Sequence, residues 1–230
     1  ILSSIPQNTP HNLPDTNVTF QGFKTIAFEN GAKLTLSSSS LTVNYTITHA
    51  GMQSNGHSVL GTIAGQNIEF SLNGITISNK LVFKLTVEIT SGSGDISLNT
   101  LLEGVIKSAT GVTATDIDVN LPAQFVLLTL PNDFEKATIA EGSMKLSAQM
   151  PDGWSGITIE EKMKVVQSGS DGFSIDPSNY RPLGNTISLE NQKLNNQSTL
   201  SCTPAFKVKL NNATYTKHDH LPVTLALDIK

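Results

Sequence analysis

The sequence predicts an all-β protein built from antiparallel, immunoglobulin-like β-sandwich modules, two of them in tandem, with at most one or two short helices. Segments in which polar and apolar residues alternate recur along the 230 residues, and this period places one face of a strand on a core and the other in water. Thr, Val and Ile dominate these segments and fit a pleated surface. One larger twisted β structure is the alternative architecture.

The composition supports the same fold class. Charged residues make up only 15% of the chain, against about 25% in typical globular proteins. Ser, Thr, Asn and Gly take their place, and these residues suit the outer faces of strands and the turns better than they suit surface helices. In composition and style the chain resembles β-rich envelope proteins of bacteria, although no motif carries that resemblance.

The first 16 residues are expected to form an irregular arm or linker. Pro6, Pro10 and Pro14 recur there without hydrophobic periodicity, and each proline pushes the preceding residue toward extended geometry. A first module is then expected over residues 17–110 and a second over residues 111–230.

Strands follow the arm with little interruption. In the first module they are predicted at residues 33–36, 41–48, 68–72, 74–78 and 81–89. Asn-Gly pairs at 30–31, 55–56 and 73–74 lie between them, and such pairs are strong hairpin signals because both residues tolerate positive φ. The short spacing favours antiparallel hairpins over βαβ units.

One helix is predicted over residues 100–108, with Asn99 as its N-cap. Its apolar stripe would consist of Leu101, Leu102, Val105 and Ile106.

The second module repeats the pattern of the first. Its strands are predicted at residues 117–119, 125–130, 144–148, 157–159, 163–166, 186–189, 206–210 and 223–229. The stretch 157–166 contains Glu160, Glu161 and two lysines, and it also fits a short helix. Residues 23–31 resemble residues 134–142 at an offset near 110, which would fit an internal duplication. Composition alone also produces such short matches, so both explanations stay open.

His218 and His220 form the one histidine cluster, in the sequence His-Asp-His. In a strand the two imidazoles would share a face and could hold one metal ion. A metal site needs a third or fourth ligand, which the sequence does not place. A solvated polar turn before Leu221 is therefore the favoured interpretation. The single cysteine, Cys202, excludes an internal disulfide and is expected to be a small buried core residue.

The acidic stretch at residues 116–120 has the opening spacing of a calcium loop. An EF-hand loop requires Gly at its sixth position and Glu at its twelfth, and this chain has Leu121 and Leu127 there. The stretch is better explained as a strand. In that strand Asp116 and Asp118 would face outward, and Ile117 and Val119 would face inward.

The sequence contains no pattern that indicates catalysis. It has no Gly-x-Ser-x-Gly elbow and no phosphate-binding glycine loop. Acidic residues that could serve glycoside hydrolysis show no pairing pattern: Asp152, Glu160, Glu161, Asp171 and Asp176. Net charge is −4 and the 15 Lys and Arg residues are spread along the chain, which argues against nucleic-acid binding. We therefore expect neither enzymatic activity nor a cofactor.

Trp154 is the main candidate for a binding residue, because it lies in a Gly-flanked loop where its ring could be an exposed stacking platform. A fold in which Trp154 closes the end of a sandwich is the alternative. Tyr180 is a second aromatic candidate for the same role.

Three functions are compatible with these observations. The favoured one is a non-catalytic structural, adhesive or binding module, in the bacterial cell envelope or secreted after removal of a signal peptide, with a protein or glycan as its partner. The second is a carrier of an apolar ligand such as lipid, which predicts an apolar tunnel or groove of roughly several hundred Å³. The third is a carbohydrate-binding module centred on Trp154. No apolar run approaches the roughly 20 residues of a membrane helix.

Overall fold

The computed structural model describes residues 7–130, 134–169, 171–218 and 221–229. In these residues the chain is all-β, with several antiparallel sheets and no helix, which confirms the predicted fold class. None of them forms a helix that could cross a membrane. Contacts within the chain divide it into two compact units. Unit 1 contains Ile1–Val112 and Asn212–Lys217, and unit 2 contains Thr113–Asn211 and His218–Lys230.

The strands of unit 1 are β1 (Pro10–Asn12), β2 (Thr16–Thr19), β3 (Thr25–Phe28), β4 (Lys33–Ser39), β5 (Val43–Ser54), β6 (His57–Leu60), β7 (Thr62–Ala64), β8 (Asn67–Ser71), β9 (Thr76–Ser78), β10 (Lys80–Gly92) and β11 (Ser97–Glu103). The strands of unit 2 are β13 (Gln124–Leu128), β14 (Lys136–Thr138), β15 (Gly142–Ala148), β16 (Ser155–Gln167), β17 (Ser174–Ile175), β18 (Arg181–Pro182), β19 (Thr186–Ser188), β20 (Lys193–Asn195) and β22 (Val223–Ile229). Two long strands contribute to both units: β12 (Ile106–Asn120) and β21 (Ser198–Thr216).

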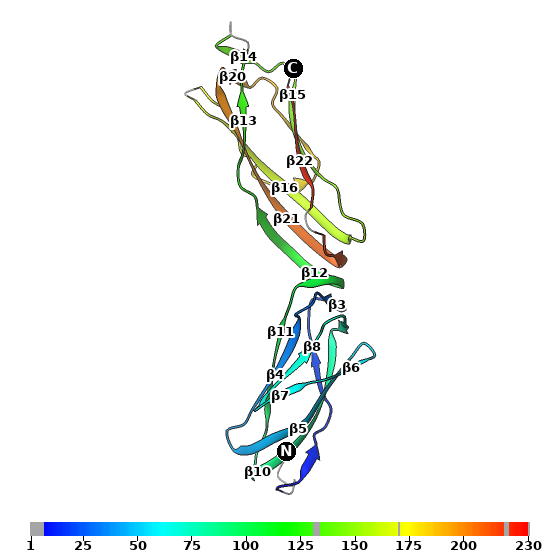
Figure 1. Ribbon diagram of the computed structural model, residues 1–230. Helices are drawn as coiled ribbons and strands as arrows, with labels where there is room; N and C mark the ends of the chain where they lie inside the picture. Colours follow the sequence, from blue (N-terminus) through cyan, green and yellow to red (C-terminus); the bar gives the residue numbers. More distant parts are fainter. Residues whose placement is uncertain (1–6, 131–133, 170, 219–220, 230) are drawn as a thin grey trace. The chain divides into compact units, whose positions relative to one another are not determined.

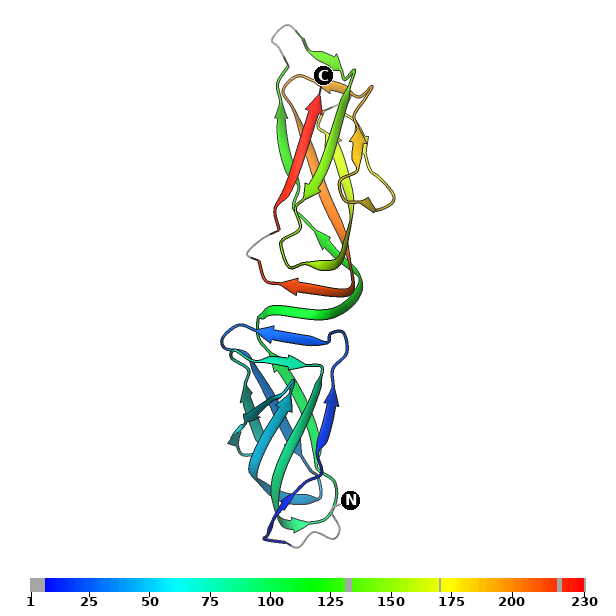
Figure 2. The same ribbon diagram turned by 90° about the vertical axis from the view of Figure 1, so that its right-hand side faces the viewer.

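Most strands of unit 1 form two sheets that pack face to face (Figures 1 and 2), while β3 pairs with β9 and with β12 in a further sheet. One sheet has the order β1-β10-β5-β6, with β2 also beside β10, and the other has the order β11-β4-β8-β7. Alternation turns every second side chain into the core, so Leu34 and Leu36 of β4 are fully buried, as are Leu81 and Phe83 of β10.

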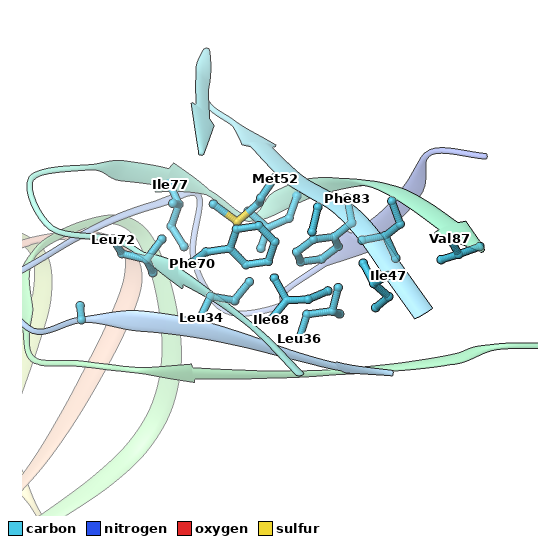
Figure 3. Close-up of a cluster of buried hydrophobic side chains, with 14 of the residues drawn as sticks. Leu34, Leu36, Ile47, Met52, Ile68, Phe70, Leu72, Ile77, Phe83 and Val87 are labelled. Carbon is cyan, nitrogen blue, oxygen red and sulfur yellow. The ribbon is translucent and has the colours of Figure 1, made fainter. Parts of the chain in front are cut away.

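Aromatic packing joins the two layers of unit 1. The rings of Phe70 on β8 and Phe83 on β10 lie with their centroids 5.7 Å apart. Figure 3 shows both rings in the middle of the cluster, with Leu34 and Leu36 on one side and Met52 on the other. The whole unit is thereby built around one continuous apolar core.

The predicted Asn-Gly turns are present. Asn55 and Gly56 both adopt positive φ, 47° and 78°, where β5 turns into β6. Gly31 and Gly74 also have positive φ, and the Gly31 amide donates to the Asn73 side-chain oxygen at 2.7 Å. That hydrogen bond connects two of the three predicted turns directly.

The N-terminal segment forms paired strands within the range where we expected an irregular arm. β1 pairs antiparallel with β10 at residues 86–88, and β2 pairs with β10 at residues 80–83. The segment therefore adds strands to a sheet of unit 1.

The predicted helix over residues 100–108 is wrong. Residues 97–103 form β11, which pairs with β4 along its entire length. Leu102 packs against the core, whereas its neighbour Leu101 is 57% exposed, which is the two-residue period of a strand. Gly104 has φ +150°, and a Cβ there would lie 2.5 Å from the Ala32 Cβ, so the chain turns at a position that only glycine fits.

Unit 2 also consists of antiparallel sheets. β16 lies between β17 and β21 and also pairs with β18, while β13 pairs with β21. The facing sheet has the order β19-β15-β22, and β14 pairs with β20. The stretch 157–166, for which strand and helix were both open, belongs to strand β16.

The predicted burial of Ile117 and Val119 on an inner face is not observed, although Val119 borders an apolar hollow of unit 2. These side chains are 41% and 39% exposed in the part of β12 that belongs to unit 2. Asp116 adopts a left-handed conformation with φ 54°, which interrupts the alternation just before them.

Candidate functional site

Two residues that the sequence singled out for different reasons lie together in unit 2. The rings of Trp154 and His218 are in edge-to-face contact, with centroids 6.3 Å apart and an interplanar angle of 72°. His218 Nε2 also lies 3.1 Å from the Asp152 carbonyl oxygen, in the same loop as Trp154. Trp154 is half-buried, so one part of its ring stays accessible.

The metal hypothesis receives no support from this arrangement. His220 lies outside the described residues. Within the described residues, no group of three or more His, Cys, Asp or Glu side chains could hold a metal ion. Cys202 is buried, and burial raises the pKa of its thiol. The site of His218 with His220 therefore stays a prediction from sequence.

Tyr180 lies in a charged setting. The Lys207 Nζ atom is 5.0 Å from the centroid of the Tyr180 ring, within cation–π range. The same Nζ atom is 3.7 Å from Asp116 Oδ1, so one lysine joins the tyrosine ring to the acidic stretch of β12. Asp116 thus takes part in an exposed ion pair.

Glu161 is the one charged side chain in the core among the described residues, and it is only 5% exposed. It occupies an inward position of β16, between Ile159 and Met163. Its carboxylate accepts backbone hydrogen bonds from Gly184 and Asn185, while Oε2 has no hydrogen-bond partner among the described residues. Burial raises the Glu161 pKa from 4.5 to about 7, although Arg181 and Lys145 oppose the shift through their charge.

An apolar cavity of about 110 Å³ lies beside this carboxylate's strand. The described residues in its wall are all hydrophobic: Val119, Ala148, Ile159, Leu183, Phe206, Val208, Leu221 and Val223. Ile159 is two residues from Glu161 on the same face of β16. The larger hollows among the described residues, of about 310–430 Å³, have polar side chains in their walls.

Strand β13 exposes two large apolar side chains on one face. Phe125 and Leu127 are 70% and 69% exposed, while Val126 and Leu128 pack against the core of unit 2. β13 pairs with β21 through Val126 opposite Leu200, and β21 is its one described partner. In both views β13 lies at the border of unit 2 (Figures 1 and 2).

Sequence reasoning proposed Trp154, Tyr180 and His218 as site residues but did not propose Glu161, Phe125 or Leu127 as such. The signal for Glu161 was present, because it occupies an apolar position of the period-two pattern from Ile157 to Val165. Phe125 and Leu127 belong to an uncharged run in which every residue is strand-forming. Which of them point outward depends on the sheet that β13 joins.

Comparisons with known proteins give little guidance. No family model and no curated protein matches the chain. Among solved structures, it is similar to A223, a turret protein in Sulfolobus turreted icosahedral virus, with 10% sequence identity over 88% of this chain and 98% of that chain. The TM-score is 0.15, which is too low for this likeness to carry an argument about fold or function.

Proposed function

We propose that this chain is a non-catalytic β-sandwich protein with a structural or adhesive role, secreted or held in a cell envelope, and that it binds a protein partner through the edge strand β13. The observation that carries the proposal is the outward pair Phe125 and Leu127 on a strand whose second edge pairs with none of the described strands.

The free edge of β13 offers the hydrogen bonds that a partner strand requires. An edge strand presents unpaired N–H and C=O groups, and a partner can add a strand to it. Native proteins usually protect such edges with charges, prolines or bulges. The run from Gln124 to Leu130 contains none of these charges or prolines, so the edge is open to pairing.

The outward side chains supply the apolar anchors. Phe125 lies opposite Ser201 and Leu127 lies opposite Thr199, so small polar residues flank the two anchors on the neighbouring strand. Large apolar side chains beside small neighbours are typical of the residues that dominate interface energies. A partner strand on β13 would cover both of them.

The double variant Phe125→Ser/Leu127→Ser tests this function. We expect it to weaken binding of the labelled protein to isolated envelopes of the source cells at least 30-fold, because loss of two anchors costs about 2 kcal/mol or more. The matched control is Leu41→Ser/Leu60→Ser, which removes two exposed leucines of unit 1, 105% and 70% exposed.

Equal binding by wild type and the β13 variant would overturn the proposal. Loss of binding in Trp154→Ala, with the β13 variant unaffected, would instead support the carbohydrate-binding hypothesis. A photo-crosslinker at position 125 identifies the partner by mass spectrometry, and the same crosslinker at position 41 shows the nonspecific background.

A second candidate function is transport or capture of a small apolar ligand, and the hydrophobic cavity of unit 2 favours it. The cavity volume of about 110 Å³ suits a group of a few carbon atoms and is well below the size expected for a whole lipid. Leu81, Phe83 and Val87, on the apolar strand predicted at residues 81–89, are fully buried in the core of unit 1 and line no ligand cavity among the described pockets.

A further inference from the structure

The cavity of unit 2 has the properties of a site for a small apolar ligand. The described residues of its wall are all hydrophobic, and the hollow is partly open to solvent, since Val119 and Val223 in its wall are 39% and 38% exposed. Water inside it would therefore find few hydrogen-bond partners. Apolar protein cavities of about 150 Å³ stay dry and bind benzene or xenon. At about 110 Å³ this cavity lies just below that size.

One wall of the cavity is held in place by Glu161. Leu183 lines the cavity and donates its backbone N–H to the Ile159 carbonyl oxygen at 3.1 Å. The next two residues, Gly184 and Asn185, donate their backbone N–H groups to the Glu161 carboxylate. The segment 181–185 therefore meets β16 through backbone pairing at residues 181–182 and through this buried side chain.

Charge compensation around Glu161 is incomplete. The charged groups that reach it are Arg181 at the start of the segment and Lys145 on β15. Neither is an ion-pair partner of Glu161 among the described contacts, and Oε2 has no hydrogen bond. A carboxylate that ionises here leaves a poorly solvated charge in the core, which favours movement of Glu161 toward water.

We propose that the apolar cavity of unit 2 binds a small apolar molecule or the end of an aliphatic chain, and that Glu161 makes this binding pH-dependent because it holds the segment that carries Leu183. The inference rests on the second candidate function. The cavity wall is complete while Glu161 is protonated, and it loosens when Glu161 ionises, so the ligand is released as the pH rises.

The direction and size of the effect follow from the two states of Glu161. The pKa of Glu161 is about 7 when the side chain is buried and 4.5 in water. The population of the opened state, in which Glu161 reaches water, therefore increases relative to the closed state as the pH rises between these values. From pH 5.5 to pH 8.5 the opening equilibrium then shifts by at most about 30-fold. The Kd of a cavity ligand rises by up to the same factor.

Methyl NMR with xenon and with benzene as probes tests the proposal. We expect both probes to shift the methyl signals of Ile159, Leu183 and Val223, with a Kd that is several-fold higher at pH 8.5 than at pH 5.5. In Glu161→Gln, which stays neutral at both pH values, the Kd is expected to be the same at both and close to the wild-type value at pH 5.5. Hydrogen exchange of the Leu183 amide, corrected for intrinsic rates, should show the same pH dependence.

A matched pair of variants tests whether the probes bind in the cavity itself. Ala148→Leu fills the cavity and should abolish the shifts, whereas Ala226→Leu makes the same change on the outer face of the paired strands β15 and β22 and should leave them intact. No probe binding at any pH would overturn both the site and the second candidate function. Binding that changes less than twofold between pH 5.5 and 8.5 would overturn the role of Glu161 while leaving that function standing.

Discussion

The two units have different interiors. Unit 1 has one continuous core, and the side-chain polar groups buried in its described part are the hydroxyls of Ser38, Ser54 and Tyr45, with no charged group among them. Unit 2 divides its core into two clusters, and it buries a carboxylate, an amide and a hydroxyl at Glu161, Gln167 and Ser198. It also contains the hydrophobic cavity and the exposed pair on β13.

This difference in the two interiors has consequences for stability. A continuous apolar core provides stability, because each buried side chain contacts many others in a close-packed interior. A divided core with a buried charge sacrifices part of that stability and gains positions that respond to a ligand or to pH. Under the proposed function, unit 1 would serve mainly as a scaffold, because the features that carry the proposals lie in unit 2.

The largest expected effect concerns the core of unit 1. Phe70→Ala should lower the free energy of unfolding of this unit by about 3–5 kcal/mol, because it leaves a large cavity between the two sheets. Urea denaturation with a methyl NMR readout for each unit measures it. The control Phe125→Ala, at an exposed phenylalanine of unit 2, should cost about 0.5 kcal/mol or less. A loss below about 1 kcal/mol in Phe70→Ala would contradict the picture of a close-packed scaffold.

An intermediate effect is expected at Glu161. Folding raises the pKa of Glu161. The contribution of its protonated form to the free energy of unfolding is therefore complete below pH 4.5 and is lost as the pH rises through about 7. Glu161→Gln should therefore stabilise unit 2 by roughly 1–3 kcal/mol at pH 8 and leave its stability unchanged at pH 4. Denaturation curves at the two pH values provide the measurement, and equal effects at both would show that ionisation is not the cause.

The smallest effect is expected on the surface of unit 1. Lys33 Nζ lies 3.2 Å from Glu69 and 3.8 Å from Glu103, with all three side chains substantially exposed. Solvent screens such pairs, so Lys33→Ala should leave the denaturation midpoint unchanged within error, at low and at high salt. A clear loss of stability in Lys33→Ala at low salt, absent at high salt, would show that surface ion pairs contribute substantially to the stability of unit 1.

The sequence alone predicted which side chains are buried wherever the local alternation of polar and apolar residues matches the two faces of the sheet. Leu34 and Leu36, or Phe83 and Leu85, alternate with polar residues, and a strand with one buried face converts that alternation directly into core and surface. Asn55-Gly56 is equally local, because its positive φ values define the turn without outside help.

Prediction of secondary structure and of side-chain orientation failed where the pairing of a strand with its neighbours determines them. Leu101, Leu102, Val105 and Ile106 fit a helical stripe, but the hydrogen bonds to β4 outweigh the local preference. The orientation of Ile117 depends on the left-handed backbone conformation of Asp116, and the residue type alone does not reveal that conformation.

The candidate site was predicted only in part, for related reasons. The contact between Trp154 and His218 joins residues 64 positions apart in the sequence, and no periodicity connects them. Glu161 and the cavity need the fold as well, because the N–H donors and the walls come from segments that only the sheets bring together.

The boundary between the units is crossed by the chain three times, after Val112, after Asn211 and after Lys217. The short return segment of β21 is held in unit 1 by a hydrogen bond from the Lys217 amide to the Lys107 carbonyl and by the Lys217–Glu29 ion pair. The fold of unit 1 is thus completed by residues that lie more than 90 positions after the rest of the unit in the sequence and are synthesised correspondingly later. No single proteolytic cut can free an intact half, and a gene truncated at residue 112 would encode an incomplete sheet.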